Sequence, residues 1–348
     1  MKRFGQGRTI VTGGAGFIGS ALVWALNRRG IDDILVVDRL HVDEKWKNLV
    51  PLRFADYVDA DEFEQRIQER PRDFSDVQCC FHLGACSSTT ETDAAYLMRN
   101  NFEYTKHLAH WALESQTQFI YASSAATYGA LEDNLSEERP LHTLRPLNMY
   151  AYSKHLFDLY AERQGWLDRI TGLKYFNVFG PNEQHKGDMR SVVHKAFAQI
   201  RERGSVKLFR SYRAEFADGK QERDFIYVKD AVEMTLHLAQ TGSAGIFNIG
   251  SGLAHTWVDL VGPIFETLGL PAQIEFIDMP GSLREKYQYS TRAATERLRA
   301  SGYAGRMTPL RSAVGDYVEN YLIEDRRMDP EVDATAGATG SRGQRTAP

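Results

Sequence analysis

The sequence predicts an α/β protein with a doubly wound parallel sheet covered by helices, joined to a smaller α/β lobe. Three observations lead to this prediction: apolar runs of strand length alternate with amphipathic segments, a glycine-rich turn follows the first run, and the alternation loosens after about residue 180. Strands buried on both faces of a parallel sheet have near-continuous apolar sequences, and the helices that cover them are apolar on one side.

The first β-α-β unit is the clearest part of the pattern. Residues Arg8 to Gly13 are β-branched and end in glycines, Phe17 to Arg29 have helical spacing, and Ile34 to Asp38 form a second apolar run. The sequence therefore begins the sheet with two parallel strands and a crossover helix. Later strands are predicted at residues 79–85, 119–124 and 173–178, and a helix is predicted at residues 93–114.

The glycine-rich turn predicts a dinucleotide site. Gly13, Gly16 and Gly19 stand between the first strand and the first helix, where the chain must turn tightly and approach a pyrophosphate closely. The positive end of the helix would then hold the phosphates. Glycines serve such turns for steric reasons alone, but the β-α-β context and Asp38 at the end of the second strand favour binding. This part of the chain is therefore expected to be of the Rossmann type.

The choice between NAD and NADP rests on conflicting signals. The Asp38 carboxylate would accept hydrogen bonds from the adenosine ribose, which favours NAD. Arg39 and Lys45 could neutralise a 2′-phosphate, which favours NADP, although Arg39 could equally be a solvated loop residue. We expect NADP as the cofactor, with NAD as the alternative.

The domain organisation follows from the same pattern. Shorter apolar runs after residue 180 indicate a lobe separate from the first sheet, and the last residues are rich in Ala, Gly, Thr and Arg, which is typical of disorder. The expected parts are a flexible extension at residues 1–8, a dinucleotide-binding domain at 9–180 with elements from 223–255, a substrate-binding lobe mainly at 181–325, and a disordered tail at 326–348.

Composition excludes several classes of protein. A net charge of -4 gives no electrostatic reason to expect nucleic acid as a partner, and no apolar stretch reaches the roughly 18 residues needed to span a membrane. The cysteines, Cys79, Cys80 and Cys86, lie in one segment, which suits reduced thiols and gives no metal-binding pattern. We expect a cytoplasmic protein with no metal ion.

A candidate redox site combines three residues. Tyr150 and Lys154 are four positions apart, so on a helix they share a face, and an ammonium near a phenol favours the phenolate. Ser124 follows an apolar run and would lie at the carboxyl edge of the sheet, where α/β folds bind ligands. Tyr150 and Lys154 alone could be a packing tyrosine and a solvated lysine. Together with Ser124 and the glycine turn, they indicate hydride transfer at a secondary alcohol.

These motifs resemble a known superfamily. GGAGFIG, FHLGACSST, YASSAATYG, YAYSK and KYFNVFGP are similar to segments of the extended short-chain dehydrogenase/reductases, over Thr9 to about Tyr321. Within that superfamily ILVVD, GACSSTTE, NVFGPNEQHKG, RDFIYV and GIFNIGSG resemble most closely the ADP-L-glycero-D-manno-heptose 6-epimerase family. The resemblance implies interconversion of two ADP-heptoses at C6, with a tightly held NADP, for the inner core of lipopolysaccharide. It also implies a homo-oligomer, a pentamer in this family.

The resemblance implies two acid/base groups, Tyr150 and Lys186, beside Ser124 and Lys154. Two groups make chemical sense because hydride leaves and returns on one fixed nicotinamide face, so the ketone must turn over before its reduction. Its oxygen then lies elsewhere, and one proton donor cannot easily serve both positions. Without the resemblance, Lys186 would be interpreted as a surface lysine.

Further binding residues are expected around this site. The expected cofactor-binding residues are Gly13, Gly16, Phe17, Ile18, Gly19, Asp38, Arg39, Lys45, Leu83, Gly84, Ala85, Cys86, Ser87, Asn100, Tyr150, Lys154 and Val178. The expected substrate-binding residues are Asn177, Asp188, Lys195, Phe209, Arg210, Ser211, Tyr212, Arg223 and Tyr287.

The substrate region departs from the family pattern at two points. The family's Phe-Glu-Gly-Ser loop is replaced by Phe209 to Tyr212, followed by a longer stretch through Lys220. A phosphate-facing histidine of the family corresponds to Lys195, although His194 is adjacent and a shift of one residue is an alternative. Arg223 and Tyr287 match family positions, but each could be structural.

Three other functions stay open. A UDP- or dTDP-sugar 4-epimerase or a 4,6-dehydratase would share the glycine turn and the Ser, Tyr and Lys residues. A dehydratase of this superfamily usually has an Asp-Glu pair after the serine, where this chain has Ala125 and Ala126. A non-catalytic NADP-binding sensor would be expected to lack the tyrosine or the lysine, and both are present.

Overall fold

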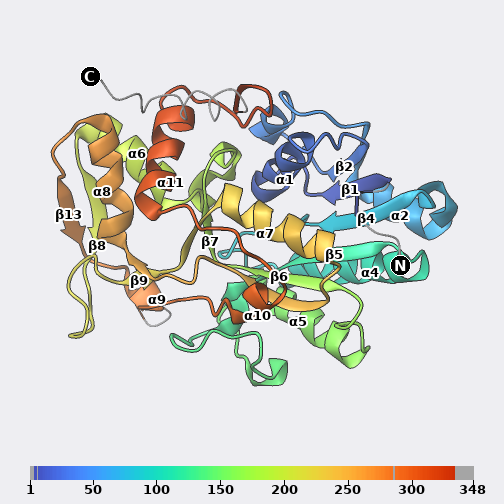
Figure 1. Cartoon of the computed structure of the whole chain (residues 1–348). Helices are drawn as coiled ribbons and strands as arrows, with labels where there is room; N and C mark the ends of the chain where they lie inside the picture. Colours follow the sequence, from blue (N-terminus) through green and yellow to red (C-terminus); the bar gives the residue numbers. More distant parts are fainter. Residues whose placement is uncertain (1–3, 6, 285–286, 334–348) are drawn as a thin grey trace.

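A seven-stranded parallel sheet forms the centre of the protein (Figure 1). Figure 1 shows a computed structural model, which describes the chain except for residues 1–3, 6, 285–286 and 334–348. The strand order is β11-β6-β5-β4-β1-β2-β3, and every neighbouring pair is parallel. The strands are β1 (Arg8–Thr12), β2 (Ile34–Asp38), β3 (Asp56–Asp59), β4 (Val77–His82), β5 (Gln118–Ser124), β6 (Thr171–Tyr175) and β11 (Gly245–Ile249).

Helices cover both faces of this sheet because successive strand residues point to opposite sides. Val11, Phe81 and Ile120 face one layer, whereas Ile10 and Cys80 face the other. All of these side chains are completely buried, which explains the near-continuous apolar runs in the sequence. One layer contains α1 (Phe17–Asn27) and α7 (Val228–Thr241), and the other contains α2 (Ala60–Glu69), α4 (Tyr104–Glu114) and α5 (Met149–Arg163).

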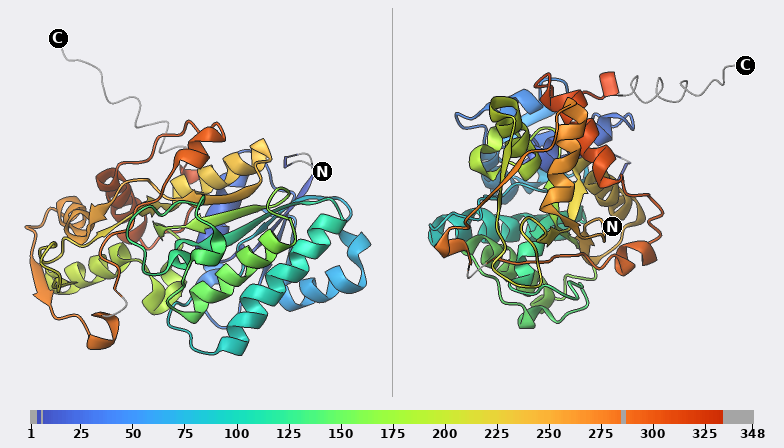
Figure 2. Two further views of the ribbon diagram at one scale, coloured as in Figure 1. Left: turned by 90° about the horizontal axis from the view of Figure 1, so that it is seen from below. Right: turned by 90° about the vertical axis from the view of Figure 1, so that its left-hand side faces the viewer.

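A smaller lobe, which we name the substrate lobe after its predicted role, lies at the other end of the molecule (Figures 1 and 2). Its helices α6 (Val192–Arg203), α8 (Trp257–Leu268) and α11 (Leu310–Tyr317) pack together, and short strand pairs flank them. The pairs are β8 (Val206–Phe209) with β13 (Ile274–Ile277), β7 (Asn177–Phe179) with β10 (Phe225–Tyr227), and β9 (Glu222–Arg223) with β12 (His255–Thr256). The short helices α3 (Ala94–Leu97), α9 (Gly281–Arg284) and α10 (Glu296–Ala300) complete the elements labelled α.

The five strands predicted for the sheet are confirmed close to their expected positions, although β3 and β11 are not among them. The helix predicted over residues 93–114 is interrupted. The segment consists of α3, a π-helical turn at Met98–Glu103 and α4. Asn101 lies in this π-helical turn, and its side chain bonds the backbone of Cys86 outside the helix. Residues 173–178 likewise divide between β6 and β7 at Phe176.

Both ends of the chain are more ordered than the composition indicates. Arg8 already belongs to β1, and the Phe4 ring packs edge-on against Phe81 at 5.6 Å. The expectation of disorder is wrong for residues 326–333, because the Met328 side chain is completely buried and Arg326 forms a 3.0 Å ion pair with Asp333. The buried side chains of Met328 and Pro330 and a few polar contacts hold this segment, which average composition does not reveal. The rest of the expected tail, residues 334–348, lies outside the described residues.

The structure also bears on the classes considered from composition. No helix in the described part of the chain is long and apolar enough to cross a membrane. The thiols of Cys79, Cys80 and Cys86 are free. Among the described residues, no three His, Cys, Asp or Glu side chains are grouped so that they could hold a metal ion.

Candidate active site

The glycine-rich turn between β1 and α1 forms a close backbone contact. A Cβ atom on Gly13, whose φ is +67°, would lie 2.7 Å from the Gly84 Cα atom. A Cβ atom on Gly19 would lie 2.0 Å from the Gly13 carbonyl oxygen, so a side chain cannot fit there without moving the turn. Gly16 caps α1 without a side-chain hydrogen bond, which leaves the amides of the first helical turn available to a pyrophosphate.

Asp38 at the end of β2 is tied to this turn. Its Oδ2 accepts a hydrogen bond from the Ala15 amide at 2.9 Å, and its Oδ1 accepts one from Lys45 Nζ at 2.9 Å. The Arg39 amide also donates to Oδ1, at 2.7 Å. The buried carboxylate therefore both fixes the glycine turn and holds a lysine beside it.

Two basic side chains, Arg39 and Lys45, lie beside Asp38, and each is paired with an aspartate. Arg39 Nη1 donates to Asn100 Oδ1 at 2.8 Å, and Arg39 Nε donates to Asp61 at 3.0 Å. Arg39, Lys45 and Asn100 line a cavity of about 160 Å³ together with Tyr104. The Tyr104 hydroxyl is buried and has no hydrogen-bond partner within the described residues. This cavity suits the ribose end of a dinucleotide.

A larger cleft of about 370 Å³ continues from this cavity along the carboxyl edge of the sheet. The residues predicted to bind the cofactor that line it are Gly13, Gly16, Phe17, Ile18, Gly19, Asp38, Lys45, Leu83, Gly84, Ala85, Cys86 and Ser87. Among the other predicted cofactor residues, Arg39 and Asn100 line only the smaller cavity. Tyr150 and Val178 line a third cavity, which contains Ser124, and Lys154 bonds the carbonyl of Ala122. The backbone cradle and this lining fit a dinucleotide.

The next cavity, of about 300 Å³, brings the predicted catalytic side chains together. Ser124 ends β5 at its wall, and Tyr150 comes from the first turn of α5. That helix begins where it does because Asn148 caps it, its side chain accepting a hydrogen bond from the Ala151 amide at 2.8 Å. Tyr150 and Ser124 thus line the same cavity.

Burial shifts the proton affinities of the pair in opposite directions. It raises the pKa of Tyr150, and the hydrogen bond from Ser124 opposes that rise. It lowers the pKa of Lys154 to about 8, and the Lys154 ammonium donates to the Ala122 carbonyl at 2.8 Å. The phenolate therefore needs further positive charge close by, which an oxidised nicotinamide brings when it is bound.

Lys186 stands where the cofactor cleft meets the catalytic cavity and lines both. It belongs to the 3-10 turn Gln184–Met189, and its Nζ lies 5.1 Å from the centre of the Phe17 ring. Burial and the charge of Lys195 lower the pKa of Lys186, while Glu183 opposes that change. A lysine with a lowered pKa can exchange a proton at neutral pH more readily than a surface lysine.

Arg223 connects the catalytic cavity to the substrate lobe. The guanidinium is buried, lies 5.0 Å from the Tyr287 ring centre and 5.7 Å from that of Trp257, and donates to the Glu222 carbonyl at 2.7 Å. Beyond the two rings lies a mainly apolar cavity of about 610 Å³, which Lys195 and Phe209 also line. Asn177 lines the catalytic cavity on the near side of Arg223. The arrangement suits a ligand with an anionic middle and a flat apolar end.

Four of the predicted substrate residues lie apart from these cavities. Asp188 is exposed, and Arg210, Ser211 and Tyr212 bond to other parts of the substrate lobe. Tyr212 donates to Asp278 at 2.8 Å, so the long loop folds toward a neighbouring segment. His194 also lies outside the apolar cavity that Lys195 lines, and its pKa is lowered to about 4 by burial and by Arg190.

Asn101 is a site residue that the sequence analysis missed. It is completely buried, and its amide group bonds the backbone N–H of Cys86 at 2.9 Å and the Cys86 carbonyl at 3.0 Å. It also donates to the Ser153 hydroxyl at 3.0 Å, next to Lys154 in α5. Asn101 thus connects the cofactor cleft to the catalytic helix. A polar residue in the middle of an apolar helical face is the only sequence signal for this role.

A buried ion pair beneath the catalytic edge was also missed. Asp158 lies one helical turn after Lys154 and accepts hydrogen bonds from Tyr121 at 2.9 Å and Ser123 at 2.7 Å. Lys174 Nζ is 3.7 Å from the same carboxylate, and both side chains are almost completely inaccessible to solvent. The signals for this pair are the spacing of four from Lys154 and a lone charge within an apolar strand.

The ion pair reaches Ser124 through Thr127. Lys174 Nζ donates to the Thr127 hydroxyl at 2.8 Å, and that hydroxyl donates to the Ser124 carbonyl at 2.7 Å. The turn that carries Ser124 is therefore held from below. Taken together, the cavities bring a dinucleotide cleft, a tyrosine, a serine and a lysine to one place, as hydride exchange with a secondary alcohol requires.

Comparisons with known proteins agree with this geometry. The model of the NAD dependent epimerase/dehydratase family matches residues 9–250. The chain is 53% identical over 315 residues to an ADP-L-glycero-D-manno-heptose-6-epimerase of Nitratidesulfovibrio vulgaris, an alignment that covers 90% of this chain and 97% of the relative.

Two solved structures share the fold. An ADP-L-glycero-D-manno-heptose-6-epimerase of Helicobacter pylori has a TM-score of 0.74 at 24% identity, with 90% of this chain and 96% of that chain covered. A UDP-glucose 4-epimerase of Thermus thermophilus in complex with NAD has a TM-score of 0.69 at 26% identity, with 90% of this chain and 100% of that chain covered.

The lowered pKa of Lys154 predicts a pH dependence of cofactor binding. The ammonium is present below a pH of about 8 and lost above it, and the charged form is the stronger hydrogen-bond donor. We expect the Kd of the cofactor-stripped protein for NADP or NAD to increase as the pH rises from about 7 to about 9.5, measured by calorimetry. Lys154→Met should bind weakly at both pH values. The same increase in Lys154→Met would contradict the assignment to Lys154.

The buried pair of Asp158 and Lys174 predicts a large effect on stability. Lys174→Met leaves the Asp158 carboxylate buried without its cation, so the free energy of unfolding should fall by about 3–5 kcal/mol in a urea titration. Adding Asp158→Asn removes the uncompensated charge and should restore part of the loss. A single variant as stable as the unaltered protein would show that the pair is not needed.

Proposed function

The chain belongs to the NAD dependent epimerase/dehydratase family, and we propose that it interconverts ADP-D-glycero-D-manno-heptose and ADP-L-glycero-D-manno-heptose at C6. The observation that carries this proposal is the convergence of Ser124, Tyr150 and Lys186 on one cavity that opens into the cofactor cleft. The identity of 53% to a heptose 6-epimerase over nearly the whole of that relative supports the choice of sugar.

The proposed chemistry is a transient oxidation. The cleft lined by Gly13, Phe17 and Asp38 would hold NADP, which would supply hydride acceptance from C6 and hydride return to the same carbon. Tyr150 accepts the proton of the C6 hydroxyl of one epimer, and Ser124 holds that hydroxyl through a hydrogen bond. Lys154 supplies positive charge below the cofactor cleft, since its ammonium points at the carbonyl of Ala122.

Inversion requires the second acid/base group. The ketone turns so that its other face meets the returning hydride, and its oxygen then lies away from Tyr150. Lys186 lines the same cavity from a different element and can donate the proton there. A lowered pKa suits this role, because burial makes the Lys186 ammonium a better proton donor than a surface lysine.

The substrate lobe supports a nucleotide diphosphate as the carrier of the sugar. The buried Arg223 has no carboxylate in an ion pair among the described residues and can meet the diphosphate. Beyond it the apolar cavity with Phe209, Trp257 and Tyr287 suits an adenine ring, and Lys195 adds charge at its rim. We propose no direct substrate contact for three of the predicted residues, Arg210, Ser211 and Tyr212. Their proposed role is to shape the loop that they form.

We propose NADP as the form of the dinucleotide. Lys45 already occupies one oxygen of Asp38, which weakens that carboxylate as an acceptor for ribose hydroxyls. Arg39 and Lys45 line the ribose cavity and would face a 2′-phosphate. NAD stays the alternative, because Asp38 would repel that phosphate.

The cellular setting is proposed from the same resemblance. We propose a cytoplasmic enzyme that supplies a precursor for the inner core of lipopolysaccharide and works as a homo-oligomer, a pentamer in the family pattern. Light scattering on the purified protein would measure the number of subunits.

The test of the function begins with the purified protein as isolated. We expect that the released dinucleotide is NADP by mass spectrometry and that ADP-D-glycero-D-manno-heptose gives the L-glycero epimer in NMR spectra. UDP-glucose serves as the control substrate and should give no 4-epimer. Formation of UDP-galactose without any heptose epimer would overturn the assignment in favour of a 4-epimerase.

The acid/base roles predict two inactive variants. Tyr150→Phe and Lys186→Met should each lower kcat by about 10²- to 10⁴-fold while the protein keeps its fold and bound dinucleotide. Matched controls are Tyr152→Phe, an exposed tyrosine of the same helix, and Lys106→Met, a lysine of α4. Near-normal turnover in either active-site variant would show that two groups are not required.

A further inference from the structure

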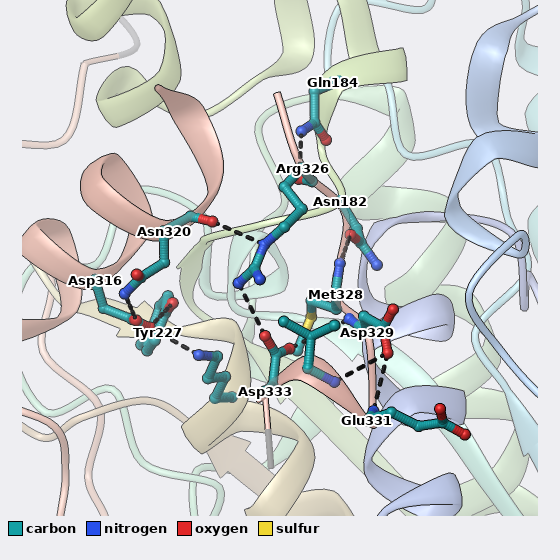
Figure 3. A network of polar contacts seen from close by, with 12 residues as sticks. Asn182, Gln184, Tyr227, Asp316, Asn320, Arg326, Met328, Asp329, Glu331 and Asp333 are labelled. Carbon is teal, nitrogen blue, oxygen red and sulfur yellow. Dashed lines mark hydrogen bonds and ion pairs between the residues drawn. The ribbon is translucent and has the colours of Figure 1, made fainter. Parts of the chain in front are cut away.

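Residues 326–333 lie against the loop that carries Lys186 (Figure 3). The Met328 amide donates to Asn182 Oδ1 at 2.9 Å, and Gln184 Nε2 donates to the Arg326 carbonyl at 3.4 Å. The Met328 side chain is completely buried. We name residues 326–333 the C-terminal clasp.

Asn182 joins the clasp to the cofactor cleft. Its Nδ2 donates to Ser20 in α1 at 3.0 Å, and its carbonyl accepts a hydrogen bond from Asn48 at 3.0 Å. Asn48 also donates to the Ala15 carbonyl in the glycine turn at 3.0 Å. Asn182 is completely buried and has a φ of +76°, a strained backbone conformation for a residue with a side chain. The surrounding contacts hold it in this conformation.

The clasp is itself anchored to the substrate lobe. Arg326 donates to the Asn320 carbonyl at 3.0 Å and pairs with Asp333 at 3.0 Å. Asn320 donates to Asp316 at 2.7 Å, and Asp316 also accepts from Lys229 at 2.7 Å. Figure 3 shows this chain of contacts running from the lobe to the loop. The clasp is therefore bonded to the substrate lobe through Arg326 and to the loop before Lys186 through Met328.

The geometry points to the C-terminal clasp and Asn182 as positioning elements for Lys186. Asn182 and Gln184 bracket Glu183, whose carbonyl accepts the Lys186 amide at 3.0 Å. The Glu183 side chain is fixed as well, by Ser191 Oγ at 2.6 Å and Tyr317 at 3.0 Å. The backbone before Lys186 is thus held on each side, so the clasp sets where the lysine lies relative to the catalytic cavity. This inference rests on the proposed role of Lys186 as an acid/base.

The experiment compares two shortened chains. A chain that ends after Asp325 lacks the clasp, and a chain that ends after Asp333 keeps it and serves as the control. Without the clasp, kcat should fall about tenfold or more while KM changes less than about twofold, because small displacements of a catalytic group cost rate more than binding. Amide exchange of residues 183–190 should become about tenfold faster. The control chain should match the full chain in both measurements.

A point variant and a double variant separate positioning from general stability. Asn182→Gly removes the side-chain contacts of Asn182, and glycine tolerates the positive φ at this position. We expect the same loss of kcat in this variant, which replaces the shortened chain as the test if that chain does not fold. In a Lys186→Met background, loss of the clasp should lower the residual rate no further, since residues that act through one group are not additive.

The outcomes decide the proposal. Unchanged kcat and amide exchange without the clasp would overturn it, and so would an equal further loss in the Lys186→Met background. If the full chain forms no second epimer, the proposed function fails. The amide exchange of residues 183–190 then decides alone whether the clasp holds the loop.

Discussion

The site depends on the close backbone contact between Gly13 and Gly19. Because neither residue has a side chain, α1 begins against the end of β1 and the turn can lie at the carboxyl edge of the sheet. Ala15 in the same turn bonds Asp38 through its amide and Asn48 through its carbonyl. Asn48 bonds the carbonyl of Asn182, which precedes the Lys186 loop. One steric constraint thus aligns the cofactor cleft and the loop of Lys186, the lysine that we propose as an acid/base group.

Burial shifts the pKa values of Tyr150 and Lys154 in opposite directions. It keeps Tyr150 neutral and makes Lys154 a weaker cation, so neither is set for catalysis by burial alone. The hydrogen bond from Ser124 to Tyr150 and the nearby charge of Asp158 both oppose these shifts. Asp158 is in turn balanced by Lys174. The charges below the sheet edge are therefore part of the acid/base system, although they touch no substrate cavity.

The sequence predicted the features that depend on local pattern. The strands predicted from apolar runs and the glycine turn after the first strand follow from local sequence pattern, and they lie close to their expected positions. Asn101 and Met328 could not be predicted in this way, since their partners Cys86 and Asn182 lie 15 and 146 residues away along the chain. Composition even indicated disorder around Met328, because a few buried side chains hardly change an average.

The long loop after Phe209 shows why the substrate end was hardest to predict. Arg213 pairs with Glu132 at 2.7 Å and lies 4.3 Å from the Tyr289 ring centre, while Glu132 accepts the Tyr289 amide at 2.6 Å. Glu132 follows the turn that carries Ser124, so the loop ties the substrate lobe to the catalytic edge. The ion pair is partly exposed and adds little stability, but it fixes the direction in which the loop after Phe209 runs. Tyr212, which the sequence predicts to bind substrate, instead donates to Asp278 and lies apart from the catalytic and apolar cavities.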